Sequence, residues 1–153
     1  MAAVRGGLAA LVLASLAGGS ALSQNPSDGA AVAHDRFRWP LRGPIVQPFK
    51  GGETDGIDIG APVGEPVHAA ADGVCIYARD ELKTYGKLVL IRHADGYVTA
   101  YADNSELDVK EGDQVRRGQI IAKSGVSGNV PHLHFELRKD GKPVDPTRYL
   151  VPL

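Results

Sequence analysis

Two histidines, His132 and His134, lie one residue apart in the stretch "VPHLHFELRKDG". Residues two apart in a β-strand point to the same face, so the two imidazoles are expected side by side. Imidazole nitrogen is a common zinc ligand, and a catalytic zinc site needs three protein ligands and an open position for water. An H-x-H pair alone is a weak motif, because surface and packed histidines produce it as well. The pair is therefore a candidate half-site that needs partners from other parts of the chain.

The elements expected to position these histidines are short strands joined by turns. The 153 residues include 19 glycines and 10 prolines, which favours many turns. Apolar runs such as "GVCIYARD" and "KLVLIRH" are bounded by turn residues, and Asp95-Gly96 is a strong hairpin signal between two such runs. No segment of about twelve residues or more keeps a helical period. The sequence predicts an all-β domain with few or no helices.

Composition narrows the function classes. Hydrophobic residues make up 43% of the chain, charged residues 23%, and the formal net charge is -1, which is typical of a globular protein. A nucleic-acid-binding surface would need a basic excess that this chain lacks. Cys75 is the single cysteine, so no intramolecular disulfide can form. Its place in the apolar run "GVCIYA" predicts a small buried side chain.

The first residues have the pattern of a secretory signal peptide. Arg5 supplies a positive charge, residues 8–16 form a short apolar run, and the small residues Ala21 and Ser23 precede a cleavage site after Ser23. We therefore interpret residues 1–23 as a signal peptide and expect a periplasmic or secreted protein. The alternative is an uncleaved membrane anchor, which the shortness of the apolar run disfavours.

The rest of the chain divides into a leader and one domain. Residues 24–36 are small and polar, and we interpret them as a flexible leader. Residues 37–153 are enough to bury one hydrophobic core. We expect the fold to begin near Phe37 to Trp39, with no second domain.

Five blocks give this domain a family resemblance. In chain order they are "GIDIGAP", "AAADGVC", "IRHADGYVTAYA", "EGDQVRRGQIIAKSG" and "HLHFELR". Taken together they resemble the lysostaphin-type zinc endopeptidases, also called LytM domains, from Trp39 to Leu150. The resemblance implies a compact LytM-like β-sheet domain, similar to the duplicated hybrid motif, with a central groove. Active members of the family cut peptide cross-links in peptidoglycan.

The resemblance assigns roles to five positions of this chain. Asp58 and His134 match two zinc ligands, and His132 matches a catalytic histidine. Thr54 stands where active members have a zinc-binding histidine. Asp103 stands where they have a second catalytic histidine. The family pattern is therefore only partly kept.

Both substitutions work against hydrolysis. Asp58 and His134 give only two protein ligands, and a threonine hydroxyl is a poor zinc ligand. An ionised Asp103 cannot donate a hydrogen bond, and it places negative charge where hydrolysis develops negative charge. We expect no catalytic residue, no bound metal and no cofactor. The alternative is that Glu53 or Asp55 replaces the lost ligand, which requires a turn, because neighbours of an extended Thr54 point to the other face.

Other conspicuous residues are expected to be structural or solvated. We interpret His93, near the hairpin turn, as structural or solvated, and His68 as a surface residue. The arginines at 116–117 are expected on a solvated face. Trp39 and Phe49 are expected to pack the core near the start of the domain.

The phrases "GIDIGAPVGEPVHAAADG" and "DPTRYL" are more similar to degenerate LytM proteins of the EnvC and NlpD type than to lysostaphin-type toxins. That resemblance implies a protein without hydrolase activity that binds and activates peptidoglycan (N-acetylmuramoyl-L-alanine) amidases in wall remodelling and division. We expect an amidase to contact the groove, which is lined by Thr54, Asp58, Asp103, His132 and His134. Peptidoglycan is a further expected ligand, whereas nucleic acid and a membrane span after signal cleavage are not expected. The alternatives are a Zn²⁺-dependent murein endopeptidase and a plain peptidoglycan-binding module.

Overall fold

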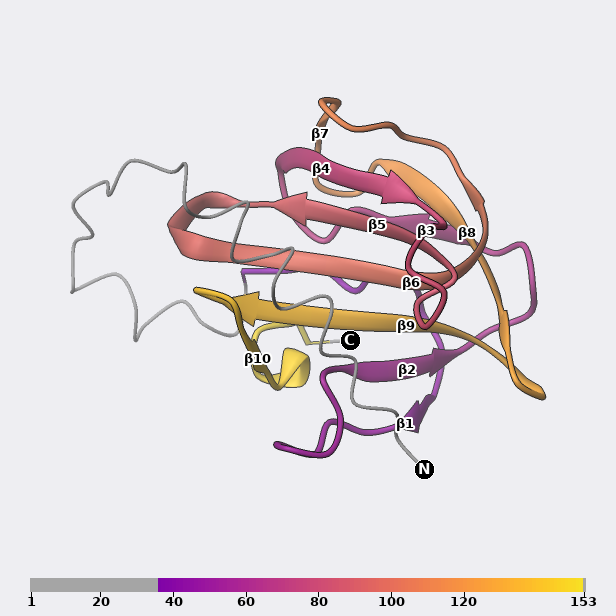
Figure 1. The fold of residues 1–153 in the computed structure, drawn as a ribbon. Helices are drawn as coiled ribbons and strands as arrows, with labels where there is room; N and C mark the ends of the chain where they lie inside the picture. Colours follow the sequence, from indigo (N-terminus) through magenta and orange to yellow (C-terminus); the bar gives the residue numbers. More distant parts are fainter. Residues whose placement is uncertain (1–35, 153) are drawn as a thin grey trace.

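The structure is a computed structural model that describes residues 36–152. The expected signal peptide at 1–23 and nearly all of the leader lie outside the described residues. Within 36–152 no helix is both long and apolar enough to cross a membrane. Apart from two short 3₁₀ turns, η2 (Ala94–Gly96) and η3 (Pro146–Arg148), the described elements are strands (Figure 1), which confirms the all-β prediction.

The strands of residues 36–152 form one ten-stranded antiparallel sheet. They are β1 (Ile45–Gln47), β2 (Ile57–Gly60), β3 (Pro66–His68), β4 (Gly73–Arg79), β5 (Lys87–Arg92), β6 (Tyr97–Leu107), β7 (Gln114–Val115), β8 (Ile120–Ser127), β9 (Val130–Lys139) and β10 (Lys142–Val144). Their order is β1-β2-β9-β8-β6-β5-β4-β7, while β10 pairs with β9 and β3 pairs with β8.

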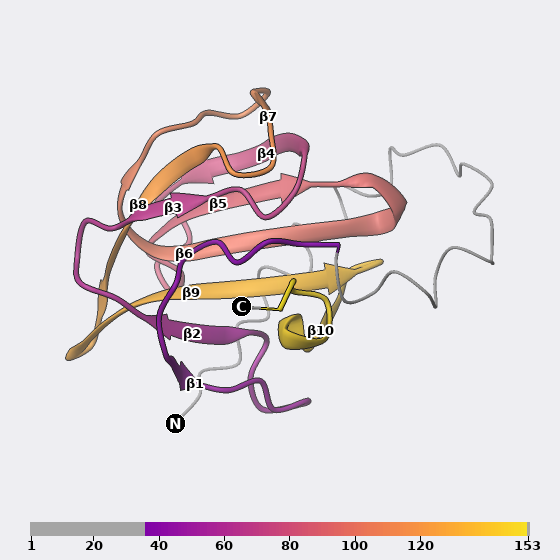
Figure 2. The same cartoon turned by 180° about the vertical axis from the view of Figure 1, so that it is seen from behind.

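Strand β9 contains the H-x-H motif and lies in the middle of the sheet. It pairs with β2 on one side, and on the other side with β8 at its start and with β6 along the rest of its length. Figures 1 and 2 show β9 running between β2 and β6 from both directions. Side chains of β9 that point away from the core therefore have neighbours on both β2 and β6.

Alternation along β9 separates the two faces of the sheet. Leu133, Phe135 and Leu137 point into the main hydrophobic core. The N-terminal segment 37–41 covers this core, and Phe37 is only 1% exposed within it. Other members of the cluster include Ile57, Ile59, Val67, Ile91, Tyr101, Ile121 and Leu150, with the predicted Trp39 and Phe49 half-buried against it. The residues between them on β9, including both histidines of the motif, therefore point to the opposite face.

The predicted hairpin joins β5 to β6. Asp95 has a φ of 63° and Gly96 a φ of 78°. Two consecutive residues with positive φ suit a tight hairpin turn, because such turns match the right-handed twist of the flanking strands. The Asp-Gly signal in the sequence is thereby confirmed.

His93 belongs to a buried hydrogen-bond network on the core side of the sheet. Its Nδ1 donates to the Asp72 carbonyl at 2.7 Å, and its Nε2 lies 2.7 Å from Thr99 Oγ1. Thr99 is hydrogen-bonded in turn to the Tyr101 hydroxyl, which accepts the Ala70 N–H. Burial lowers the pKa of His93 to about 4, so the ring is neutral at physiological pH. Of the two interpretations of His93, the structural one is confirmed.

Two other predictions about single residues had different outcomes. Cys75 is buried, and burial raises the pKa of its thiol to about 11, as suits a small packed side chain. The prediction for His68 was wrong, because this residue is half-buried rather than on the surface. Its Nδ1 lies 2.9 Å from the Gly118 carbonyl, and this contact fixes the ring between β3 and the loop before β8.

Candidate functional site

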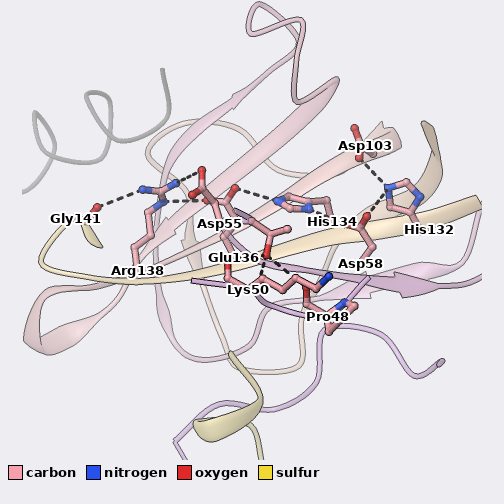
Figure 3. Close-up of polar contacts among 11 residues, drawn as sticks. Pro48, Lys50, Asp55, Asp58, Asp103, His132, His134, Glu136, Arg138 and Gly141 are labelled. Carbon is pink, nitrogen blue, oxygen red and sulfur yellow. Dashed lines mark hydrogen bonds and ion pairs between the residues drawn. The ribbon is translucent and has the colours of Figure 1, made fainter. Parts of the chain in front are cut away.

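The structure brings together four of the five residues that the family resemblance singled out. Asp58 on β2 lies opposite His134 on β9, and its Oδ1 is 2.6 Å from His134 Nδ1. His132 Nε2 is 3.0 Å from Asp103 Oδ2 and 3.8 Å from Asp58 Oδ2 (Figure 3). The two carboxylates and two imidazoles thus form one contiguous cluster.

The backbone of Asp103 explains how β6 contributes to this cluster. Strand β6 pairs with β9 as far as Ala102, opposite His134, and pairs with β8 from Asn104 onward. Between these two ladders Asp103 has a φ of 61°. This left-handed conformation is uncommon outside glycine, although aspartate tolerates it better than most residues. The break in alternation directs the Asp103 carboxylate toward His132 instead of into the core.

Both ring nitrogens of His132 face acceptors. Nδ1 lies 2.7 Å from the Val130 carbonyl, and Nε2 faces the Asp103 carboxylate. An acceptor at each nitrogen requires a hydrogen on each, which is the imidazolium form. The hydrogen bond that His132 donates to Asp103 raises the pKa of His132, and this effect outweighs the opposing effect of burial. His132 in this arrangement has no free lone pair with which to act as a general base.

Both ring nitrogens of His134 face carboxylates. Asp58 accepts from Nδ1, and Glu136 Oε1 lies 2.9 Å from Nε2. Carboxylate acceptors therefore lie at both ring nitrogens of His134, and one of them, Asp58, is itself a position that the family resemblance matches to a zinc ligand.

The cluster continues along β9 through two residues that the sequence analysis missed. Glu136 Oε2 is 2.9 Å from Arg138 Nε, and Arg138 Nη2 is in ion-pair contact with Asp55 at 3.3 Å. The Glu136 and Arg138 side chains are 0% and 2% exposed. We call the whole set the charged row: Asp103, His132, Asp58, His134, Glu136, Arg138 and Asp55. Opposite charges alternate along it, so each buried charge has a neighbour of opposite sign.

A period-two signal in "HLHFELR" could have predicted the extension of the row. Polar residues occupy every second position from His132 to Arg138, with apolar residues between them. On a strand this pattern places all four polar side chains on one face. Gly56, just before β2, leaves room for the Glu136 side chain. A Cβ at this position would come within 2.8 Å of Glu136 Cγ and closer still to the Phe135 carbonyl.

Thr54 is the family position that does not join the cluster. Its hydroxyl accepts the Lys50 N–H at 2.7 Å and lies 3.4 Å from the Pro48 carbonyl, within the turn that precedes β2. The two carboxylates weighed as replacement ligands also face elsewhere, since Glu53 is exposed and Asp55 pairs with Arg138.

The donors present do not fit a catalytic zinc ion. Such a site needs three protein ligands, whereas Asp58 and His134 are hydrogen-bonded to each other and the Thr54 hydroxyl is held in its turn. In the part of the chain that the structure describes, no three or more His, Cys, Asp or Glu side chains are arranged to hold a metal ion. We therefore derive no reaction step through zinc.

The fold and the retained positions define a domain of the zinc-peptidase type in which the metal site is incomplete. Residues 52–146 match the model of Peptidase family M23, and the chain belongs to this family. A zinc-containing peptidase from Vibrio cholerae has a similar structure, with a TM-score of 0.68 and 32% identity over 78% of this chain and 41% of that one.

Two relatives are similar in sequence. The cell division protein DipM of Caulobacter vibrioides is 44% identical over 82% of this chain and 23% of its own length. The murein hydrolase activator NlpD of Escherichia coli is 43% identical over 74% of this chain and 31% of its own length. The chain thus spans less than a third of either relative.

Proposed function

We propose that this chain is a non-catalytic M23 domain of the cell envelope that binds and activates peptidoglycan amidases, the N-acetylmuramoyl-L-alanine amidases, in wall remodelling and division. The observation that carries the proposal is the state of the two histidines. Each nitrogen of His132 and of His134 faces an oxygen acceptor. In this arrangement neither ring presents a nitrogen to an open position.

The relatives support the activating role. One of them is named a murein hydrolase activator and another a cell division protein. The charged row lies within residues 52–146, the part of this chain that matches the M23 family. The envelope location rests on the signal peptide expected at residues 1–23, and the mass of the exported protein would test it, since cleavage after Ser23 leaves a chain that starts at Gln24.

The partner is expected to bind on the side of the sheet that carries the charged row. Asp58 and Asp55 are its most accessible members, with side chains 22% and 31% exposed, whereas both histidines are 8% exposed. Val130, which is 51% exposed, lies on the same face of β9 as His132, at the end of the row next to the β8–β9 hairpin. An exposed apolar side chain beside a few accessible charges is a surface that a partner can desolvate. Activation then requires that the surface bind the active form of the amidase more tightly than the inactive form.

The central test measures solubilisation of purified murein sacculi. The protein is expected to release nothing alone, to contain no stoichiometric zinc, and to raise the rate of the amidase of the same organism. If the protein alone cuts murein in a chelator-sensitive reaction, the zinc endopeptidase alternative is correct. If it sediments with sacculi and activates no amidase of the organism, it is a plain peptidoglycan-binding module.

A matched pair of variants locates the activating surface. Val130→Glu puts a charge on this apolar position beside the charged row, and it should abolish activation without changing the fold. Ile120→Glu is the control, because Ile120 is a similarly exposed apolar residue, 47% exposed, at the end of β8 that lies away from the β8–β9 hairpin. Equal activation by the two variants would place the amidase on a different surface.

A further inference from the structure

A cavity of about 750 Å³ lies away from the charged row. Its walls are the segment 38–44, which precedes β1, and the stretch 60–68, which joins β2 to β3. In the view from behind, the segment before β1 crosses in front of the sheet beside this connection (Figure 2). Among the described residues, no member of the charged row lines the cavity. It is therefore a separate candidate site.

The cavity has more positive than negative charge. Arg38 and Arg42 line it together with a single carboxylate, Glu65. Within residues 36–152 neither arginine is paired with a carboxylate, whereas the nearby Arg36 forms an ion pair with Asp95. A guanidinium binds a carboxylate through two parallel hydrogen bonds. Two unpaired guanidinium groups at one cavity therefore favour an anionic ligand.

Trp39 gives the cavity a fixed aromatic wall. Its indole Nε1 donates to the Val151 carbonyl at 2.8 Å, and the half-buried ring packs against the main core. The opposite wall is also held in place, because the Ser124 hydroxyl accepts the Glu65 N–H at 3.0 Å and donates to the Pro62 carbonyl at 2.8 Å. A site with both walls fixed loses little conformational entropy when a ligand binds.

We propose that this cavity binds an anionic sugar, a pyranose ring that carries a carboxylate, such as N-acetylmuramic acid. The C–H face of the sugar would pack on the indole of Trp39, and the carboxylate would pair with Arg38 and Arg42. The volume lies within the usual range of small-molecule sites, about 300–1,000 Å³. This site is independent of the amidase-activating surface, because no residue of the charged row lines it.

The first test is calorimetric titration of the exported chain with N-acetylmuramic acid and, separately, with N-acetylglucosamine, which lacks the carboxylate. The acid should bind saturably, and the neutral sugar at least about tenfold more weakly, because it forms no charge-assisted hydrogen bond. Acetate and the dipeptide L-alanyl-D-glutamate serve as further probes of the carboxylate alone. Equal affinity for the two sugars, or tighter binding of the dipeptide than of the sugar acid, would overturn the proposal.

Two variants and a control assign the binding to this cavity. Arg42→Gln and Trp39→Phe should each weaken binding of N-acetylmuramic acid by about tenfold. The first removes a charge that pairs with the carboxylate, and the second reduces the ring surface that contacts the sugar. Arg92→Gln removes the same charge from an exposed position on β5 and should leave the affinity unchanged. If Arg92→Gln lowered the affinity as much as Arg42→Gln, the effect would come from the net charge of the protein and not from this cavity. Arg42→Gln should still activate the amidase, so failure of this proposal and of the proposed function can be told apart.

Discussion

The two faces of one sheet hold buried histidines in opposite states. On the core side His93 has only neutral partners, a backbone carbonyl and a hydroxyl, and burial keeps the ring neutral. On the other side His132 and His134 face three carboxylates between them. The residue type is the same and all three side chains are largely buried. The difference shows that the partners on neighbouring strands, rather than burial alone, decide whether a histidine here is a structural or a charged group.

The largest predicted effect comes from a substitution in the charged row. Arg138→Met leaves Glu136, which is 0% exposed, without its guanidinium partner. Removing one partner of a buried ion pair costs about 3–5 kcal/mol, so the free energy of unfolding should fall by that amount in urea titrations.

The control for this prediction is a second substitution in the same row. The double variant Glu136→Gln with Arg138→Met should recover part of the loss, because no unpaired charge is then left in the interior. A single-variant loss below about 1 kcal/mol would mean that water reaches Glu136 and that the row is not a buried network.

The second prediction concerns the neutral histidine, His93, and the way in which it makes the free energy of unfolding depend on pH. Because the pKa of His93 is about 4 when folded and near 6.5 in an unfolded chain, the unfolded chain binds a proton first as pH falls. His93 therefore makes the protein less stable between about pH 6.5 and pH 4, by about 3 kcal/mol in total. The free energy of unfolding of His93→Gln should decline less over this interval than that of the wild type. Parallel curves for the two proteins would show that His93 binds its proton equally well in the folded and the unfolded chain.

The sequence predicted the strands, the Asp95-Gly96 hairpin and the grouping of Asp58 with the H-x-H pair, because each depends on local pattern or on the family motif. It did not predict the contact of Asp103 with His132. That contact requires β6 to change its pairing partner at a left-handed residue, and no local pattern specifies this change.

Two further features of the site depended on contacts between distant segments. The recruitment of Asp55 to Arg138 joins the turn before β2 to the far half of β9, and pairing register across such distances is a property of the tertiary structure. The half-burial of His68 likewise comes from Gly118, fifty positions away. Strand alternation in "HLHFELR" was visible in the sequence, but it shows only that these residues share a face and not which charges they meet.

The third prediction tests whether His132 responds to pH in the opposite direction from His93. The pKa of His132 is raised, so its interaction with Asp103 stabilises the protein fully below about pH 6.5 and is lost as pH rises through the higher folded value. Asp103→Asn should therefore cost about 1.5 kcal/mol near pH 6 and progressively less at higher pH. A cost that is the same at every pH would mean that His132 is not charged in the folded protein.

The smallest effect is expected from an ion pair that shares the chemistry of the charged row but not its burial. Lys123 and Glu106 are 3.2 Å apart with side chains 41% and 57% exposed. Water and salt screen such a pair, so Glu106→Gln should change the free energy of unfolding by less than about 0.5 kcal/mol, and the change should vanish at high salt. Arg138→Met, in contrast, should keep most of its effect at high salt, because buried charges are screened far less. If high salt removed the effects of both Glu106→Gln and Arg138→Met, the charged row would be accessible to dissolved ions. Its carboxylates could then pair with other cations in place of the two histidines.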